Sequence, residues 1–90
     1  MSFQSTVASP SGATYPTLPD LACNFEPLYL LLEVTSGGDA YVSLDGINDA
    51  KLIKAADTSP TRLDARCKKV WVRRAAAGTA ASVNVGAYTL

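Results

Sequence analysis

Short stretches in which apolar and polar residues alternate, each ended by a turn signal, restrict the fold of this sequence more than any other feature. In residues 28–35, leucine or valine occupies every second position, and Ser36-Gly37-Gly38 follows directly. A side-chain period of two is that of a β-strand with one buried face. Because Gly-Gly permits positive φ angles, the pattern predicts that this strand ends in a tight hairpin.

Further stretches of the same kind follow, and Phe3 to Ala8 can form one more strand. In the strongest stretch, Val70 and Val72 share one face while Trp71 and Arg73 share the other. No stretch has the period of an amphipathic helix. The sequence therefore predicts an all-β fold, a small antiparallel β-sandwich or barrel (jelly-roll-like) of six to seven short strands. The expected strands after the first two lie at residues 40–44, 52–53, 62–66, 68–74 and 81–89.

The N-terminal part has a different composition. Pro10, Gly12, Pro16 and Pro19 interrupt regular structure as far as Leu21. We therefore expect residues 1–26 to form an extended N-terminal arm with a Pro-rich loop, and residues 27–90 to form the β-sandwich domain. A loop lying on a neighbouring surface, a partly disordered N-terminus and a short helical turn at residues 21–24 are open alternatives.

The length and composition indicate one globular domain with a thin core. Of the 90 residues, 48% are hydrophobic and 18% are charged. No window has the 18 or so apolar residues that a membrane-spanning helix needs, so no membrane partner is expected. The first residues lack the basic and apolar regions of a secretory signal, and we expect the chain to be used without translocation.

The residues that catalysis most often uses are missing or scattered. The chain has no histidine, which removes the usual general base, the usual zinc ligand and every Ser-His or Cys-His pair. Gly37-Gly38 does not follow the phosphate-loop pattern. The sequence predicts no enzyme, no catalytic residue, no metal and no cofactor. Cys23 and Cys67 are expected to be reduced, with a single disulfide as the alternative.

The segment from Asp45 to Asp49 places oxygen donors at alternate positions, as a calcium loop does. It lacks the bidentate glutamate and the spacing of an EF-hand. Asp and Asn side chains also form turns by accepting hydrogen bonds from their own backbone. Turn formation is the prediction here, and a bound cation is the alternative.

Charge is divided unequally along the chain, although the net charge is zero. Residues 1–50 carry six acidic and no basic side chains, and residues 51–90 carry eight basic and two acidic ones. The two halves either interleave within one molecule or make a surface that is complementary to another copy. The sequence leaves both interpretations open.

A basic cluster surrounds Trp71. Neighbouring positions of a strand face opposite sides, so its charges are divided between two faces, and the zero net charge also argues against a nucleic-acid partner. Trp with Arg is typical of the residues that dominate protein interfaces. The predicted protein interface consists of Arg66, Lys68, Lys69, Trp71, Arg73 and Arg74, with the acidic Asp45 and Asp49.

Three segments carry a resemblance to a known family. "AYVSLDG" at residues 40–46, "KKVWVRR" at residues 68–74 and "ASVNVGAYT" at residues 81–89 resemble segments of small structural proteins of tailed bacteriophages. The resemblance covers residues 27–90. It implies a β-sandwich component of the virion, a capsid decoration (cement) protein on the outer surface of the head, made in the host cytoplasm.

Such a protein would have itself, as a homo-oligomer and by the same resemblance a trimer, and the major capsid protein or another virion protein as partners. The alternatives are a neck or tail component and a carbohydrate- or receptor-binding module of a tail. In the last of these, aromatic side chains would stack on sugar rings. The aromatic candidates are Tyr29, Tyr41, Trp71 and Tyr88.

Overall fold

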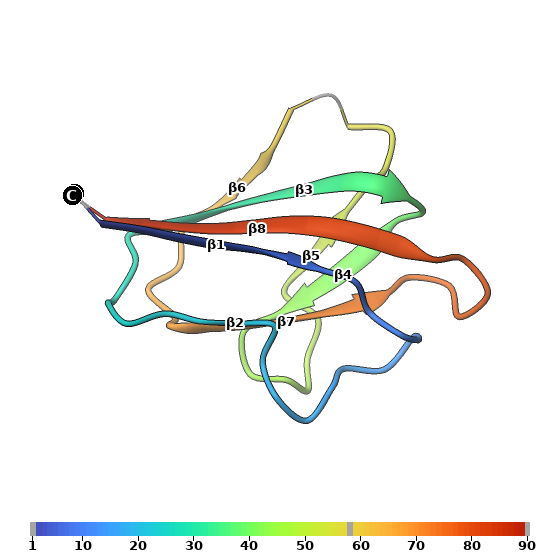
Figure 1. Ribbon diagram of the computed structural model, residues 1–90, viewed down its shortest axis with the longest axis horizontal. Helices are drawn as coiled ribbons and strands as arrows, with labels where there is room; N and C mark the ends of the chain where they lie inside the picture. The colour runs from blue at the N-terminus through green and yellow to red at the C-terminus, as the bar shows by residue number, and fades with distance from the viewer. Residues whose placement is uncertain (1, 58, 90) are drawn as a thin grey trace.

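Two four-stranded antiparallel sheets pack face to face in the computed structural model, which describes residues 2–57 and 59–89 (Figure 1). The first sheet has the order β1-β8-β3-β6, and the second has the order β2-β7-β4-β5. The predicted all-β sandwich is confirmed at this level, with eight strands in the described residues instead of six or seven. The strands are β1 (Ser2–Ala8), β2 (Leu21–Ala22), β3 (Tyr29–Gly37), β4 (Ala40–Ser43), β5 (Lys51–Ile53), β6 (Thr61–Leu63), β7 (Lys69–Arg74) and β8 (Ala81–Thr89).

The strands pair from the two ends of the chain toward its middle. β1 pairs with β8, β2 with β7, β3 with β6 and β4 with β5, always antiparallel. Successive pairs alternate between the two sheets, and the contacts β3–β8 and β4–β7 join them within each sheet. The topology is therefore that of one long hairpin rolled into two layers.

The core lies between the two sheets and consists of the inward positions of the alternating stretches. Leu30, Leu32, Val70, Val72 and the valines of β8 have no exposed surface. The inward faces predicted from the period of two are thus confirmed for β3, β7 and β8. Trp71 and Arg73 point to the outer side of the second sheet, as the alternation predicts.

The N-terminal part belongs to the sandwich. This differs from the prediction that residues 1–26 form an extended arm outside it. β1 pairs with β8 along its whole length, from Ser2–Thr89 to Ala8–Val83. At residues 21–22 the chain forms β2 and not a helical turn, because the amide of Asp20 donates to Val70 O (2.8 Å) and that of Cys23 to Lys68 O (2.7 Å). Between β1 and β2 the Pro-rich residues 9–20 form an irregular loop.

The predicted hairpin at Gly37-Gly38 is wrong, although Gly37 does have a positive φ of 86°. β3 and β4 lie in different sheets, so this segment carries the chain across the edge of the sandwich. The hairpin of this region is instead β4–β5, whose loop contains Gly46 with a φ of 80°. The strand expected at residues 62–66 is also shorter, since β6 ends at Leu63.

Candidate protein-interaction site

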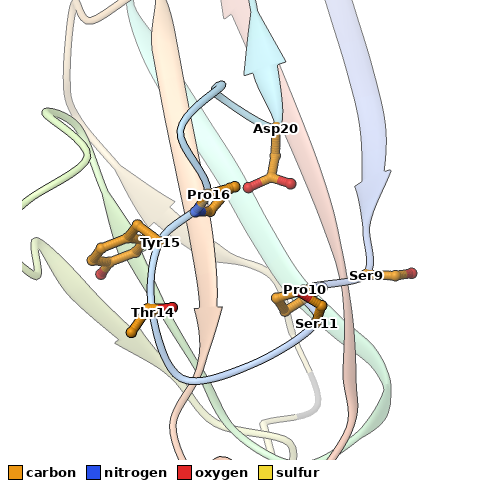
Figure 2. A pocket seen from close by; sticks show the side chains of 7 residues that line it. All are labelled: Ser9, Pro10, Ser11, Thr14, Tyr15, Pro16 and Asp20. Carbon is orange, nitrogen blue, oxygen red and sulfur yellow. The ribbon is translucent and has the colours of Figure 1, made fainter.

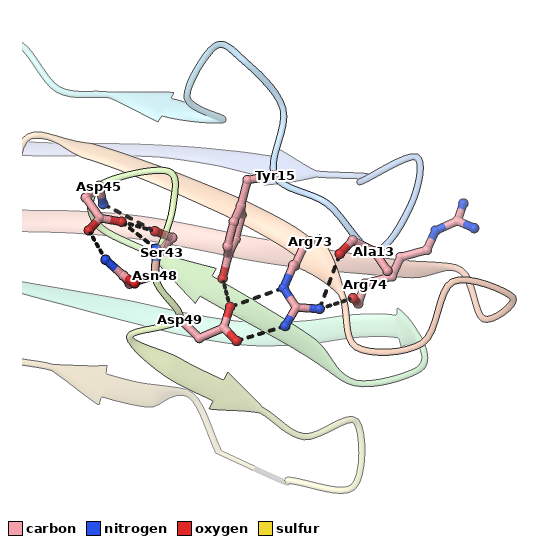
Figure 3. Close-up of polar contacts among 8 residues, drawn as sticks. All are labelled: Ala13, Tyr15, Ser43, Asp45, Asn48, Asp49, Arg73 and Arg74. Carbon is pink, nitrogen blue, oxygen red and sulfur yellow. Dashed lines mark hydrogen bonds and ion pairs between the residues drawn. The ribbon is translucent and has the colours of Figure 1, made fainter.

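Arg73 occupies the centre of a polar cluster on the outer face of the second sheet (Figure 3). Its strand β7 pairs with β4 so that Arg73 lies opposite Tyr41, and its guanidinium lies 4.4 Å from the centre of the Tyr41 ring. Nε donates to Asp49 Oδ1 (3.1 Å) and Nη2 to Asp49 Oδ2 (2.8 Å), a bidentate ion pair. Nη1 donates to the carbonyl oxygen of Ala13 (3.4 Å) and to that of Arg74 (3.1 Å). One side chain thus connects β7, the β4–β5 loop and the Pro-rich loop.

Tyr15 of the Pro-rich loop completes the cluster, because its hydroxyl donates to Asp49 Oδ1. Burial, and the hydrogen bond to Asp49, raise the pKa of the Tyr15 phenol well above its usual range. The hydrogen bonds from Arg73 and Tyr15 hold the pKa of Asp49 below its usual range. At neutral pH the cluster therefore contains one cation, one anion and a neutral donor, an arrangement that fixes loops in place.

The loop after β4 is held by its own side chains. The buried Ser43 hydroxyl accepts from the amides of Asp45 (3.2 Å) and Gly46 (2.9 Å) and donates to Asp45 Oδ1 (2.9 Å). Asp45 Oδ1 also accepts from the amides of Ile47 and Asn48, both at 2.8 Å. These bonds confirm the turn chemistry predicted for Asp45. They leave Ile47 at the tip, 80% exposed.

Gly46 fits this loop against Trp71. An added Cβ at Gly46 would lie 3.0 Å from Cε2 of the Trp71 indole, and its φ of 80° also disfavours any other residue. Trp71 is therefore half-buried beneath the loop. Its position explains why the tryptophan of the basic cluster is not a freely exposed side chain.

Acid is expected to weaken the fold through Asp45. Backbone hydrogen bonds from Asn48 and Ile47 lower the pKa of the Asp45 carboxyl far below its usual range. The ionised form therefore adds stability above the unfolded-state pKa of about 3.9, and this stability is lost as the pH falls toward the folded-state pKa. Asp49 acts in the same direction, whereas burial raises the pKa of Asp20, which acts in the opposite direction. Thermal unfolding of the native chain and of Asp45→Asn between pH 5 and pH 2 checks this: the variant should lose less stability on acidification, and equal losses would contradict the role of Asp45.

Two shallow depressions flank Tyr15. One, of about 320 Å³, is lined by the Arg73 cluster and the β4–β5 loop, with Ile47 among its lining residues. The other, of about 210 Å³, lies under the Pro-rich loop from Ser9 to Pro16 and includes Asp20 (Figure 2). Asp20 Oδ2 accepts a hydrogen bond from the amide of Val72 (2.7 Å), so this carboxylate pairs with the edge of β7 just before β2 begins. The surface around Tyr15 is thus a fixed and slightly hollowed face with an apolar rim.

The structure distributes the predicted interface residues over several places. Asp49 pairs with Arg73, and Asp45 bonds within its own loop. Arg74 donates to the carbonyl oxygens of Pro10 (3.0 Å) and Ala77 (3.1 Å). Arg66, Lys68 and Lys69 are exposed, and Arg66 lies 3.8 Å from Glu26. Their role at an interface stays a prediction, but two of the ion pairs join the acidic half of the chain to its basic half and so favour interleaving.

Sequence reasoning missed two features of the outer surface. Tyr15 lies in the segment that was expected to form an arm, and no local sequence signal indicates its place on the second sheet. The other feature is a row of side chains across the first sheet: the Phe3 and Tyr88 rings stack at 5.0 Å, the Tyr88 and Tyr29 rings at 5.3 Å, and Arg62 lies 4.2 Å from the centre of Tyr29. The register Phe3–Tyr88–Tyr29 brings these residues together from three strands.

Comparisons with protein-family models, with curated proteins and with solved structures find no match for this chain. In the part of the chain that the structure describes, no helix is long and apolar enough to cross a membrane. Among the same residues, no three Cys, Asp or Glu side chains gather closely enough to hold a metal ion. Cys23, which is buried, and Cys67, which is partly exposed, are free thiols, as predicted.

Proposed function

We propose that this protein is a structural component of a tailed-bacteriophage virion, and that it decorates the assembled head by binding the shell. The resemblance of residues 27–90 to phage structural proteins supports the virion class. The observation that carries the proposal further is the pairing of the eight strands, first with last and second with seventh, in two four-stranded sheets.

This pairing supports a jelly roll as the finer class of the fold. A jelly roll has eight strands in two sheets and is used by viral capsid proteins, and also by lectins. Since one fold serves several functions, the choice between them has to be argued from the surface of the protein. Two properties of that surface are relevant: how firmly its loops are held, and whether its aromatic rings are free.

The face around Arg73 fits a protein partner. Tyr, Trp and Arg dominate the energy of protein interfaces. Tyr15 and Arg73 line this face, and Trp71 lies half-buried beneath its Gly46 loop. Hydrogen bonds that Asp45 accepts from its own loop, and those that Arg73 donates to Asp49, fix both loops before any partner arrives, so little conformational entropy remains to be lost on binding. Ile47 then offers an apolar contact at the rim. Many copies, each making a small contact of this kind, would hold a shell firmly by multivalency.

The geometry does not favour the carbohydrate-binding alternative. A sugar ring needs the open face of an aromatic ring, but the faces of Tyr88 lie against Phe3 and Tyr29. Tyr29 is covered on its other side by Arg62, and Arg73 lies over Tyr41. The rings therefore stack on their own neighbours. A neck or tail component remains the second candidate, because a protein-binding face serves it equally well.

Co-sedimentation tests the proposal. We expect the purified chain to sediment with assembled heads of the phage that encodes it and not with separated tails, and Ile47→Asp to weaken this binding at least tenfold. Ala56→Asp adds the same charge at an exposed position on the loop after β5 and should bind as the native chain does. Because Ile47 is 80% exposed, its variant should keep the native unfolding temperature. Binding to tails alone would favour a tail component over a head decoration protein. Binding to neither would overturn the proposed role in the virion.

A further inference from the structure

The free edge of β1 is unlike the other sheet edges of the molecule. An edge strand presents a row of unpaired N–H and C=O groups, and natural proteins protect such edges with short strands, charged residues, prolines or bulges. β2 has two residues, and β5 and β6 have three each, with Lys51 on β5 and Arg62 on β6. β1 has seven residues, from Ser2 to Ala8, and lies at the edge of the first sheet (Figure 1).

β1 carries none of these protections. Its sequence, SFQSTVA, contains no charged residue and no proline, and its register with β8 runs without a shift from end to end. In the described residues, β8 is the one strand that pairs with it, and no other backbone group bonds to its backbone. Gln4 reaches across to Ala22 and Asn24 through its side chain, which leaves the backbone edge open.

The outward face of β1 also carries two large apolar side chains, on either side of Ser5. Phe3 is 58% exposed and Val7 is 60% exposed, and they stand on the same face because they are four residues apart. They are two of the four large hydrophobic side chains that are exposed in the described residues. Among the described residues, no other ring lies against the face of the Phe3 ring that points away from Tyr88, which is the end of the stacked row. An apolar partner at this edge would cover it.

We propose that β1 pairs antiparallel with β1 of a second copy, about a two-fold axis through Ser5. In this register Ser5 lies opposite the partner's Ser5, and Phe3 lies opposite the partner's Val7. Directly opposed residues have Cβ atoms about 4.5–5.5 Å apart, so each Phe3 packs against the partner's Val7. The two first sheets become one continuous sheet, and the uncharged strands bring no like charges together.

The strand itself indicates a second copy as the occupant. Phe3 and Val7 are placed symmetrically about Ser5, so β1 is complementary to itself when it is turned by two-fold symmetry. Such an interface uses the same patch on both copies and closes at two. The β1 pairing does not depend on the proposed function. A dimer that does not bind phage heads would support the pairing and would refute the role in the virion.

Cysteine cross-linking at Ser5 tests the pairing, in a Cys67→Ser background that removes the partly exposed native thiol. The two-fold axis places the Ser5 Cα atoms about 4.5–5.5 Å apart, within reach of a disulfide, and the Val7 Cα atoms about 14 Å apart, which is out of reach. On oxidation we expect Ser5→Cys to form a covalent dimer and Val7→Cys, its control on the same face, to remain uncross-linked. Light scattering should give the mass of a dimer for the native chain.

A second variant keeps the test independent of cysteine chemistry. Val7→Lys puts two positive charges at the shared edge and should weaken association at least tenfold while the chain remains folded, because Val7 is exposed in one copy. A monomer at about 100 µM, a trimer without a Ser5 cross-link, or a cross-link through position 7 in place of position 5 would each overturn the pairing. A dimer that Ser5→Cys does not cross-link would place the interface elsewhere and overturn it as well.

Discussion

Replacing Leu32 with alanine is expected to lower the free energy of unfolding by about 2–5 kcal/mol. Leu32 lies on β3 with no exposed surface, opposite Val85 of β8 and Thr61 of β6, and faces the second sheet. The substitution removes apolar contacts and leaves a cavity that rigid neighbouring strands fill only in part. A domain of this size has about 5–15 kcal/mol of stability in total, so a large part would be lost. Urea unfolding measures the loss as a lower midpoint at an unchanged slope.

Leu31→Ala is the matched control for this prediction. Leu31 is the preceding residue of the same strand and points to the outer face, where it is half-buried. The same change there should lower the free energy of unfolding by about 1 kcal/mol, because less apolar surface returns to water. Similar losses at both positions would contradict the assignment of the two faces of β3.

The faces of the strands could be predicted from sequence, whereas their partners could not. Which side of a strand is buried depends on a period of two that is visible within six or seven residues, as at Leu30 and Leu32. Pairing depends on the packing of the whole chain. The Gly37-Gly38 segment has the local chemistry of a hairpin, but β3 pairs with β8 and β6 in the first sheet, and the chain crosses to the other sheet instead.

The same distinction applies to the candidate site. Asp49 and Arg73 were both predicted to lie at a protein interface, which stays a prediction; in the structure they pair within one molecule, because the β4–β5 hairpin brings the end of its loop back over β7. Tyr15 could not be assigned to the site, since nothing local shows that residues 9–20 fold across the second sheet. The stacked row of Phe3, Tyr88 and Tyr29 requires the register of three strands. The side-chain types therefore indicate which charged and aromatic groups are present, and the strand topology decides which of them lie together.

Gly37→Ala is expected to lower the free energy of unfolding by about 2–5 kcal/mol, the sum of a conformational and a steric cost. The φ of 86° at Gly37 lies in the left-handed region, which an L-residue with a Cβ disfavours by about 1–2 kcal/mol. The new Cβ would also overlap the backbone carbonyl oxygen of Ala80, which no side-chain rotation relieves. Because this segment carries the chain from the first sheet to the second, the strain falls on the ends of β3 and β8 together.

Gly38→Ala is the control that separates the conformational and steric costs at Gly37 from the effect of adding a methyl group anywhere in this segment. Gly38 has no positive φ, and its added Cβ would meet the side-chain methyl group of Thr79, which is exposed and free to rotate. We expect Gly38→Ala to change the free energy of unfolding by about 1 kcal/mol or less. In thermal unfolding, Gly37→Ala should lower the midpoint by about 10 °C or more, and Gly38→Ala by a few degrees. If the two variants melted together, the left-handed conformation of Gly37 would not be what holds the crossing between the sheets.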